Sequence, residues 1–147
     1  MKRLVITWAL AVVLFGLAGF AEATDKPFVN VSATPDKLDL GTASIFADSY
    51  DVPAAITVNV ESNCMHGPIM ISTTKLKRRQ GGSISPERIF VKTQATEGFV
   101  TMARPVAISK STEGPHEIVL DLRVDTKFLD PAGEYTGIVT ITIMPPA

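Results

Sequence analysis

The sequence predicts an all-β sandwich, and two observations lead to this prediction. Many short segments alternate apolar and polar residues, are rich in β-branched side chains, and are separated by turn-forming Gly, Pro, Asn and Asp. Beyond residue 23, no segment shows a sustained helical period of apolar residues. Two antiparallel sheets that each turn one apolar face inward satisfy this pattern, and we expect about seven to nine strands.

The N-terminal residues 1–23 are predicted to be a cleaved secretory signal peptide. The basic pair Lys2–Arg3 precedes an uncharged apolar run, Leu4–Phe20, and Ala21–Ala23 has small residues at both positions of a cleavage site. The alternative is an uncleaved membrane anchor, although the run is at the short limit for crossing a bilayer. We therefore expect an exported protein, periplasmic or at the cell surface or extracellular, with one domain, residues 24–147, and no membrane span after cleavage.

The first half of the domain is predicted to contain four strands. In each of them every second residue is apolar, and a turn signal such as Thr34–Asp36 or Gly41 follows. Residues 42–51 carry apolar residues without a clean period, so we expect a loop with a short strand or a turn of helix. The four strand segments are 28–33, 37–41, 54–61 and 69–73.

The second half begins with Lys75–Ser83, which is basic and then glycine-rich and is predicted to be an exposed loop. Short strands are expected over 88–92, 99–102 and 105–108, with Pro105 marking an edge or a bend because proline cannot donate to a ladder. A longer strand is expected over Ile118–Val124, with its even-numbered residues facing inward.

The last strand carries the strongest pattern in the chain. Pro131 and Gly133 mark a turn, after which Tyr135–Ile143 alternates between an apolar face and a threonine-rich face. No charge occurs from Ile138 to Met144, so an unpaired edge here would promote aggregation. We expect this strand to be paired inside the sheet or presented to another chain. The inward-facing residues are predicted to be Tyr135, Gly137, Val139, Ile141 and Ile143.

The segment Asp130–Ile143 resembles the last-strand motif of bacterial exported immunoglobulin-like β-sandwich domains. In that motif an AG-x-Y-x-G/D turn, here Ala132–Gly137, leads into an alternating Thr/Val/Ile strand; spore-coat-U-like secreted pilins and WxL-type domains end similarly. The resemblance implies an immunoglobulin-like sandwich. The chain departs from both families, because residues 24–147 contain no tryptophan and the lone Cys64 cannot form an intradomain disulfide.

The composition favours a non-enzymatic protein without a cofactor. The chain has 14 Lys and Arg and 15 Asp and Glu, a net charge of −1, which argues against a nucleic-acid-binding protein. A serine-type triad would need His66 or His116 beside a serine and a carboxylate, and there is no Gly-x-Ser-x-Gly elbow.

Cys64 and His66 are the candidate metal ligands. Together with Met65 they form the one cluster of soft ligands, a set that suits Cu(I), and Met70 and Met102 are possible additions. The alternatives are a buried, inert thiol beside an exposed histidine, or an intermolecular disulfide through Cys64.

A short basic run, Lys75, Lys77, Arg78 and Arg79, is a candidate interaction site. It would suit an anionic polymer such as lipopolysaccharide or wall phosphate. The alternative is an ordinary solvated hairpin loop.

These observations together favour a structural or protein-interaction role at the bacterial envelope, without catalysis. We expect the partner to be another envelope protein, or a second copy of the chain, bound through strand edges. One alternative is a pilin-like subunit completed by strand donation, with Val29, Val31 and Ala33 as donor positions. The other is a periplasmic copper-binding protein that uses Cys64 and His66.

Overall fold

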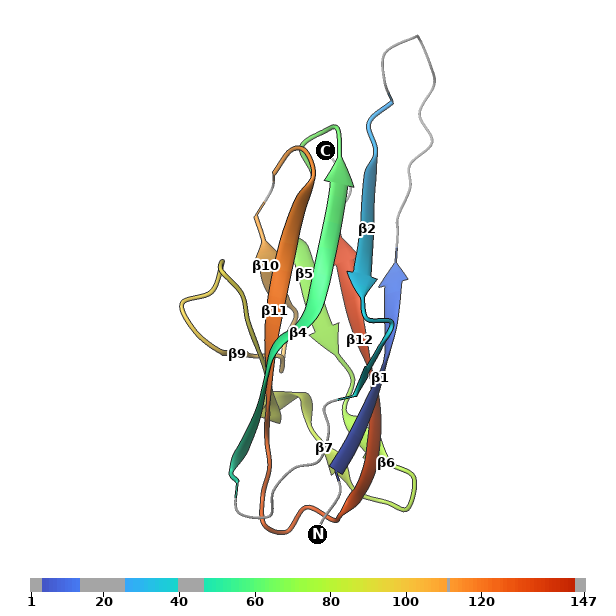
Figure 1. Cartoon of the computed structure of the whole chain (residues 1–147), viewed down its shortest axis with the longest axis vertical. Helices are drawn as coiled ribbons and strands as arrows, with labels where there is room; N and C mark the ends of the chain where they lie inside the picture. The colour runs from blue at the N-terminus through green and yellow to red at the C-terminus, as the bar shows by residue number, and fades with distance from the viewer. Residues whose placement is uncertain (1–3, 14–25, 40–46, 111, 145–147) are drawn as a thin grey trace.

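A computed structural model of the chain describes residues 4–13, 26–39, 47–110 and 112–144. These residues form an all-β sandwich of two packed sheets, which confirms the predicted fold class (Figure 1). In this part of the chain the one helical element is a single 3-10 turn, η1 (Pro86–Arg88). None of the described helical structure has the length and apolarity that crossing a bilayer requires.

One sheet, here called sheet B, has five antiparallel strands in the order β2-β4-β11-β8-β9. Its centre is the long pair β4 and β11, whose register runs from His116 opposite Val60 to Asp125 opposite Ser49. The strands are β2 (Val29–Thr34), β4 (Ser49–Ser62), β8 (Ile89–Lys92), β9 (Val100–Thr101) and β11 (His116–Asp125).

The other sheet, sheet A, has seven strands, with β10-β5-β12-β1-β3 along its main path. The small strand β6 also pairs with β12, and β7 pairs with β6. Every ladder in this sheet is antiparallel except the one between β1 and β12, which is parallel. The strands are β1 (Leu4–Val13), β3 (Lys37–Asp39), β5 (Ile69–Thr73), β6 (Leu76–Arg78), β7 (Ser83–Ile84), β10 (Val106–Ser109) and β12 (Gly133–Ile143).

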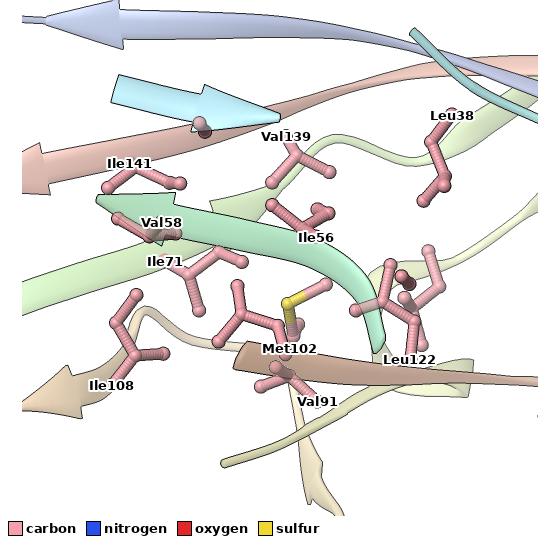
Figure 2. Close-up of a cluster of buried hydrophobic side chains, with 14 of the residues drawn as sticks. Leu38, Ile56, Val58, Ile71, Val91, Met102, Ile108, Leu122, Val139 and Ile141 are labelled. Atoms are coloured by element: carbon pink, nitrogen blue, oxygen red, sulfur yellow. The ribbon is translucent and has the colours of Figure 1, made fainter. Parts of the chain in front are cut away.

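The core lies between the two sheets and follows from the period of two in the strands. Alternate residues of a strand point to opposite faces, so one apolar row from each strand meets the facing sheet. Figure 2 shows side chains from β4, β5, β11 and β12 converging around Met102, which is 2% exposed. The inward rows predicted for the two longest strands of the second half are confirmed: Ile118, Leu120, Leu122, Val124, Tyr135, Val139, Ile141 and Ile143 are all buried.

An irregularity in β4 was not predicted. The register with β11 shifts between Leu120 and Leu122, and β4 inserts Pro53, Ala54 and Ala55 opposite the single residue Asp121. The backbone N–H of Ala54 (φ 48°) donates to Asp121 Oδ1 at 2.8 Å, which supplies the partner that the interrupted ladder lacks.

Two further predictions need correction. Lys75–Ser83 is not a simple loop, because β6 and β7 form a small hairpin on the edge of β12. The short strands β6, β7 and β9 also raise the strand number above the expected seven to nine. Leu40 and residues 42–46 of the undecided segment 42–51 lie outside the described residues, while Ser49 begins β4.

The donor positions of the pilin-like alternative are Val29, Val31 and Ala33, and the chain itself uses the strand that carries them. They lie in β2, which pairs with β4 of the same sheet B, and Val31 and Ala33 are buried in the chain's own core. A strand that already completes one sheet of its own domain cannot be donated without opening that sheet.

We expect Leu122→Ala to destabilise the fold by about 2–5 kcal/mol, because it removes methyl groups from a fully buried site and leaves a cavity. The free energy of unfolding is measured by chemical denaturation. Val119→Ala, on the solvent side of the same strand and 39% exposed, is the matched control and should cost far less. Equal losses for the two variants would contradict this assignment of faces.

Candidate functional site

The feature that distinguishes this sandwich is the strand that lies beside β12. All ten residues of β1 pair with β12 in parallel, from Leu4 opposite Gly133 to Val13 opposite Thr142. On its other side β1 pairs with β3 in antiparallel orientation, with Trp8 opposite Leu38 at the middle of the ladder. The N-terminal segment that the sequence predicts as a leader is therefore an internal strand of sheet A.

The two neighbours of β1 depend on it for their hydrogen bonds. One edge of β12 pairs with β5 and β6, and its other edge pairs with β1. Among the described residues, β3 pairs with β1 and with no other strand. We define the acceptor gap as the space between the β12 edge, Gly133–Thr142, and β3, Lys37–Asp39. In this structure β1 fills the acceptor gap.

The start of β12 is held by contacts that the basic run partly supplies. Arg78 Nη1 donates to the Ala132 carbonyl at 2.8 Å, and its Nε donates to the Gly81 carbonyl at 2.6 Å. Gly133 has a φ of 148°, and a Cβ there would lie 2.8 Å from Arg78 Cδ, so glycine is required. Arg78 is thus a structural residue rather than a free cation.

The other three residues of the basic run, Lys75, Lys77 and Arg79, are exposed. Lys77 lies on β6 opposite Thr136, and Arg79 follows that strand in the turn of the β6–β7 hairpin. The structure therefore separates the predicted run into one anchoring arginine and three solvated cations.

Tyr135 fixes the turn into β12 from the inside. Its hydroxyl donates to the Pro131 carbonyl at 2.8 Å, and its ring is completely buried. Burial, with a contribution from the charge of Asp130, raises the pKa of the Tyr135 phenol above its ordinary value. The hydroxyl therefore stays protonated and keeps donating this bond at neutral pH.

The turn before β12 is held by Asp130. Its carboxylate accepts from Arg88 Nη1 at 3.0 Å, from Arg88 Nη2, and from the backbone N–H of Lys127 at 2.6 Å. Burial alone would raise the pKa of Asp130, but the bonds from Arg88 and Lys127 outweigh it, so this pKa is lowered. The ionised carboxylate is the form that holds the turn.

The end of β12 is held by the connection between β4 and β5. Gly67 N–H donates to the Met144 carbonyl at 3.2 Å, and Met144 N–H donates to the Pro68 carbonyl at 3.4 Å. A Cβ on Gly67 would overlap the Cβ of Met144, so a side chain there would push the two segments apart. Both ends of β12 are therefore fixed, and the edge between them meets β1.

His66, in the same connection, is buried rather than exposed as expected. It is 2% exposed and stacks on His116, with ring centroids 5.7 Å apart and 6° between the ring planes. Its Nδ1 lies 2.8 Å from the Gly67 carbonyl and donates to it, and among the described residues its buried Nε2 has no hydrogen-bond partner. The local sequence does not indicate this contact, because His66 and His116 are distant in the chain.

Cys64 does not join His66 in a recognisable metal site. Its thiol is half-buried, and Sγ donates to the Phe28 carbonyl at 3.6 Å. In the described ranges, no three or more His, Cys, Asp or Glu side chains are grouped so that they could hold a metal ion. Of the additional ligands considered, Met102 belongs to the core.

A triad at His116 was the other chemical possibility. Ser109 Oγ lies 3.5 Å from His116 Nε2, but this hydroxyl donates to the Lys110 carbonyl at 3.0 Å. His116 Nδ1 faces the Gly114 carbonyl at 3.2 Å, the position where a serine-type triad has a carboxylate. Ser109 and His116 therefore form a contact between the end of β10 and the start of β11, and Ser109 is not placed as the activated nucleophile of a triad.

The sequence analysis did not predict β1 as a strand. Basic residues, an apolar run and small residues follow one another over residues 1–23, and this order is typical of a signal peptide. A signal was present: Val5, Ile6, Thr7, Val12 and Val13 are β-branched, and such residues favour strands.

The fold and the acceptor gap define a class of protein: an all-β sandwich whose sheet A is continuous when a further strand lies between β12 and β3. No protein-family model matches the chain, and a search of curated proteins finds no match.

We expect Asp130→Asn to reduce stability at neutral pH by weakening the bonds to Arg88 and Lys127. Because the pKa of Asp130 is lowered in the folded chain, its contribution is present above about pH 4 and is lost as the pH falls through the folded value. Urea unfolding at pH 7 and at about pH 3 should show the difference between wild type and variant shrinking on acidification. The exposed Asp36→Asn serves as the control, and a difference that grows on acidification would contradict this role of Asp130.

We expect Gly67→Ala to destabilise the chain by about 1–3 kcal/mol, because the new methyl group would meet Met144. Gly98→Ala is the matched control, since a Cβ at Gly98 meets nothing within 4 Å. Thermal unfolding of the two variants measures the effect. A neutral Gly67→Ala variant would mean that the β4–β5 connection does not hold the end of β12.

Proposed function

We propose that this protein is an exported, non-catalytic interaction protein of the bacterial envelope, which binds its partner by taking a β-strand into the acceptor gap. The observation that carries the proposal is the ten-residue parallel ladder between β1 and β12. If the predicted cleavage after Ala23 occurs, the chain loses the strand that fills this gap.

The edge left by cleavage would be costly to leave open. It spans Gly133–Thr142, and from Ile138 onward it carries no charge, whereas natural sheet edges are commonly protected by charges, prolines or bulges. Each backbone hydrogen bond contributes a net amount of about 0.5–1.5 kcal/mol, so a strand that restores the ladder gains affinity from many such bonds. A partner strand is a direct way to satisfy this edge.

Strand addition also offers a basis for specificity. Main-chain hydrogen bonds provide affinity in this mode, and alternate side chains distinguish one partner from another. The inward row of β12, which includes Tyr135, Val139 and Ile141, is apolar and buried. A partner strand with apolar residues at every second position would continue this row.

The pilin-like subunit is a special case of the same function. It agrees with the immunoglobulin-like resemblance of Asp130–Ile143 and with the acceptor gap, although β2, which carries the predicted donor positions, already pairs with β4 in sheet B. The copper-binding alternative has less support, because within the described residues no three or more His, Cys, Asp or Glu side chains are grouped so that they could hold a metal ion.

We expect the exported, processed protein to bind a synthetic peptide of Leu4–Val13, with lysines appended for solubility. Binding should raise the melting temperature and slow amide exchange at Gly133–Thr142, because the peptide restores the ladder. Calorimetry or fluorescence anisotropy gives the affinity.

The control for this binding test is a peptide with the reversed sequence. It has the same composition but the reverse order of side chains, so over the same ten positions of a parallel ladder its tryptophan would lie opposite Ile138 instead of Gly137, and we expect much weaker binding. No binding of either peptide, with unchanged exchange along β12, would refute the proposed function.

A further inference from the structure

We infer that Leu4–Val13 acts as a built-in occupant of the acceptor gap, which keeps the partner site closed in the unprocessed chain and opens it on cleavage. This inference rests on the proposed function and adds its regulation and the chemistry of the partner strand. The partner is an uncharged, β-branched-rich strand of another polypeptide that runs parallel to β12.

The first step is the fit of β1 to the acceptor gap. The ladder with β12 shows no register shift over its whole length, and β3 pairs with the middle of β1 from the other side. Because β1 pairs with a strand on each of its edges, it makes more backbone hydrogen bonds than a segment that pairs on one edge alone. The segment therefore occupies the same hydrogen-bonding groups that a partner strand would need.

The second step concerns the residue pattern. Ile6, Leu10 and Val12 are in register with the buried residues Tyr135, Val139 and Ile141. Trp8, the largest residue of the segment, is in register with Gly137, the residue of that inward row which has no side chain. A Cβ at Gly137 would lie 2.6 Å from Leu76 Cδ2, so any side chain at this position would require the buried Leu76 to shift.

The residue pattern expected of the partner strand follows from the register between β1 and β12. It carries apolar residues at every second position, and its largest side chain is opposite Gly137. The segment itself has no charged residue over Leu4–Val13, so a partner strand with charges at the alternate positions would not replace it.

The third step is the direction of the strand. Two copies of the chain that paired through their β12 edges around a two-fold axis would run antiparallel. The occupant of the acceptor gap is parallel to β12 over its full length. The site therefore favours a separate donated segment over a symmetric dimer of β12 edges.

The last step is competition. A segment joined to the domain by its own chain has an effective concentration commonly in the mM range, so it outcompetes a separate strand of similar affinity. Cleavage after Ala23 would remove this advantage without changing any contact in the gap. The leader then delays partner binding until the chain has been processed.

The test uses the full chain, made without export and carrying a protease site inserted after Ala23. The probe is a fluorescent Leu4–Val13 peptide, and its occupancy is measured before and after the cut. We expect at least tenfold more bound probe after the cut, and Trp8→Asp should allow binding even to the uncut chain. Lys26→Asp, at an exposed residue outside the ladder, is the control and should leave the uncut chain closed.

Amide exchange at Lys37–Asp39 gives a second readout. Because the described pairing of β3 is to β1, protection there should fall in the uncut Trp8→Asp variant and return when the probe binds. Equal probe binding by the cut and uncut wild-type chains would overturn the built-in occupant while leaving strand acceptance intact. Failure of the probe on every form, including the exported protein, would overturn the proposed function as well.

Discussion

The structure depends on the hydrogen bonding of β12 along both of its edges. This strand crosses the centre of sheet A, contributes Tyr135, Val139, Ile141 and Ile143 to the core, and pairs with β5 and β6 on one side. On the other side it pairs with β1, a segment that we predict to be part of a cleaved signal peptide. The same strand therefore organises the core and, if that segment is cleaved off, would present the edge Gly133–Thr142 without its partner β1.

Hydrogen bonds to other parts of the chain hold both ends of β12 in place. At its start, Arg78, Tyr135 and Asp130 hold the turn through carbonyls and backbone N–H groups of residues 127–132. At its end, Gly67 and Pro68 pair with Met144. Charged and aromatic side chains thus position the start of β12. Because β12 is held at both ends, its edge is well suited to receive a strand without rearrangement of the core.

Several features of the candidate site could be predicted from the sequence, and others could not. The alternation in Tyr135–Ile143 and the absence of charge after Ile138 predicted a strand that must be paired or presented to a partner. Nothing in the local pattern of Arg78 distinguishes it from Lys77, because its role depends on a carbonyl 54 positions away in the chain. The stacking of His66 on His116 likewise joins two residues that are distant in the chain.

The sequence by itself determined the all-β class and the inward rows of the long strands, because a period of two is a local property of the chain. It could not determine which strands become neighbours, since backbone hydrogen bonds between strands carry no residue code. Only the tertiary structure decided that Leu4–Val13 lies between β12 and β3, that Lys75–Ser83 forms a hairpin on β12, and that β2 belongs to sheet B. These pairings arise from long-range packing, which closes the core around the alternating faces that the local sequence supplies.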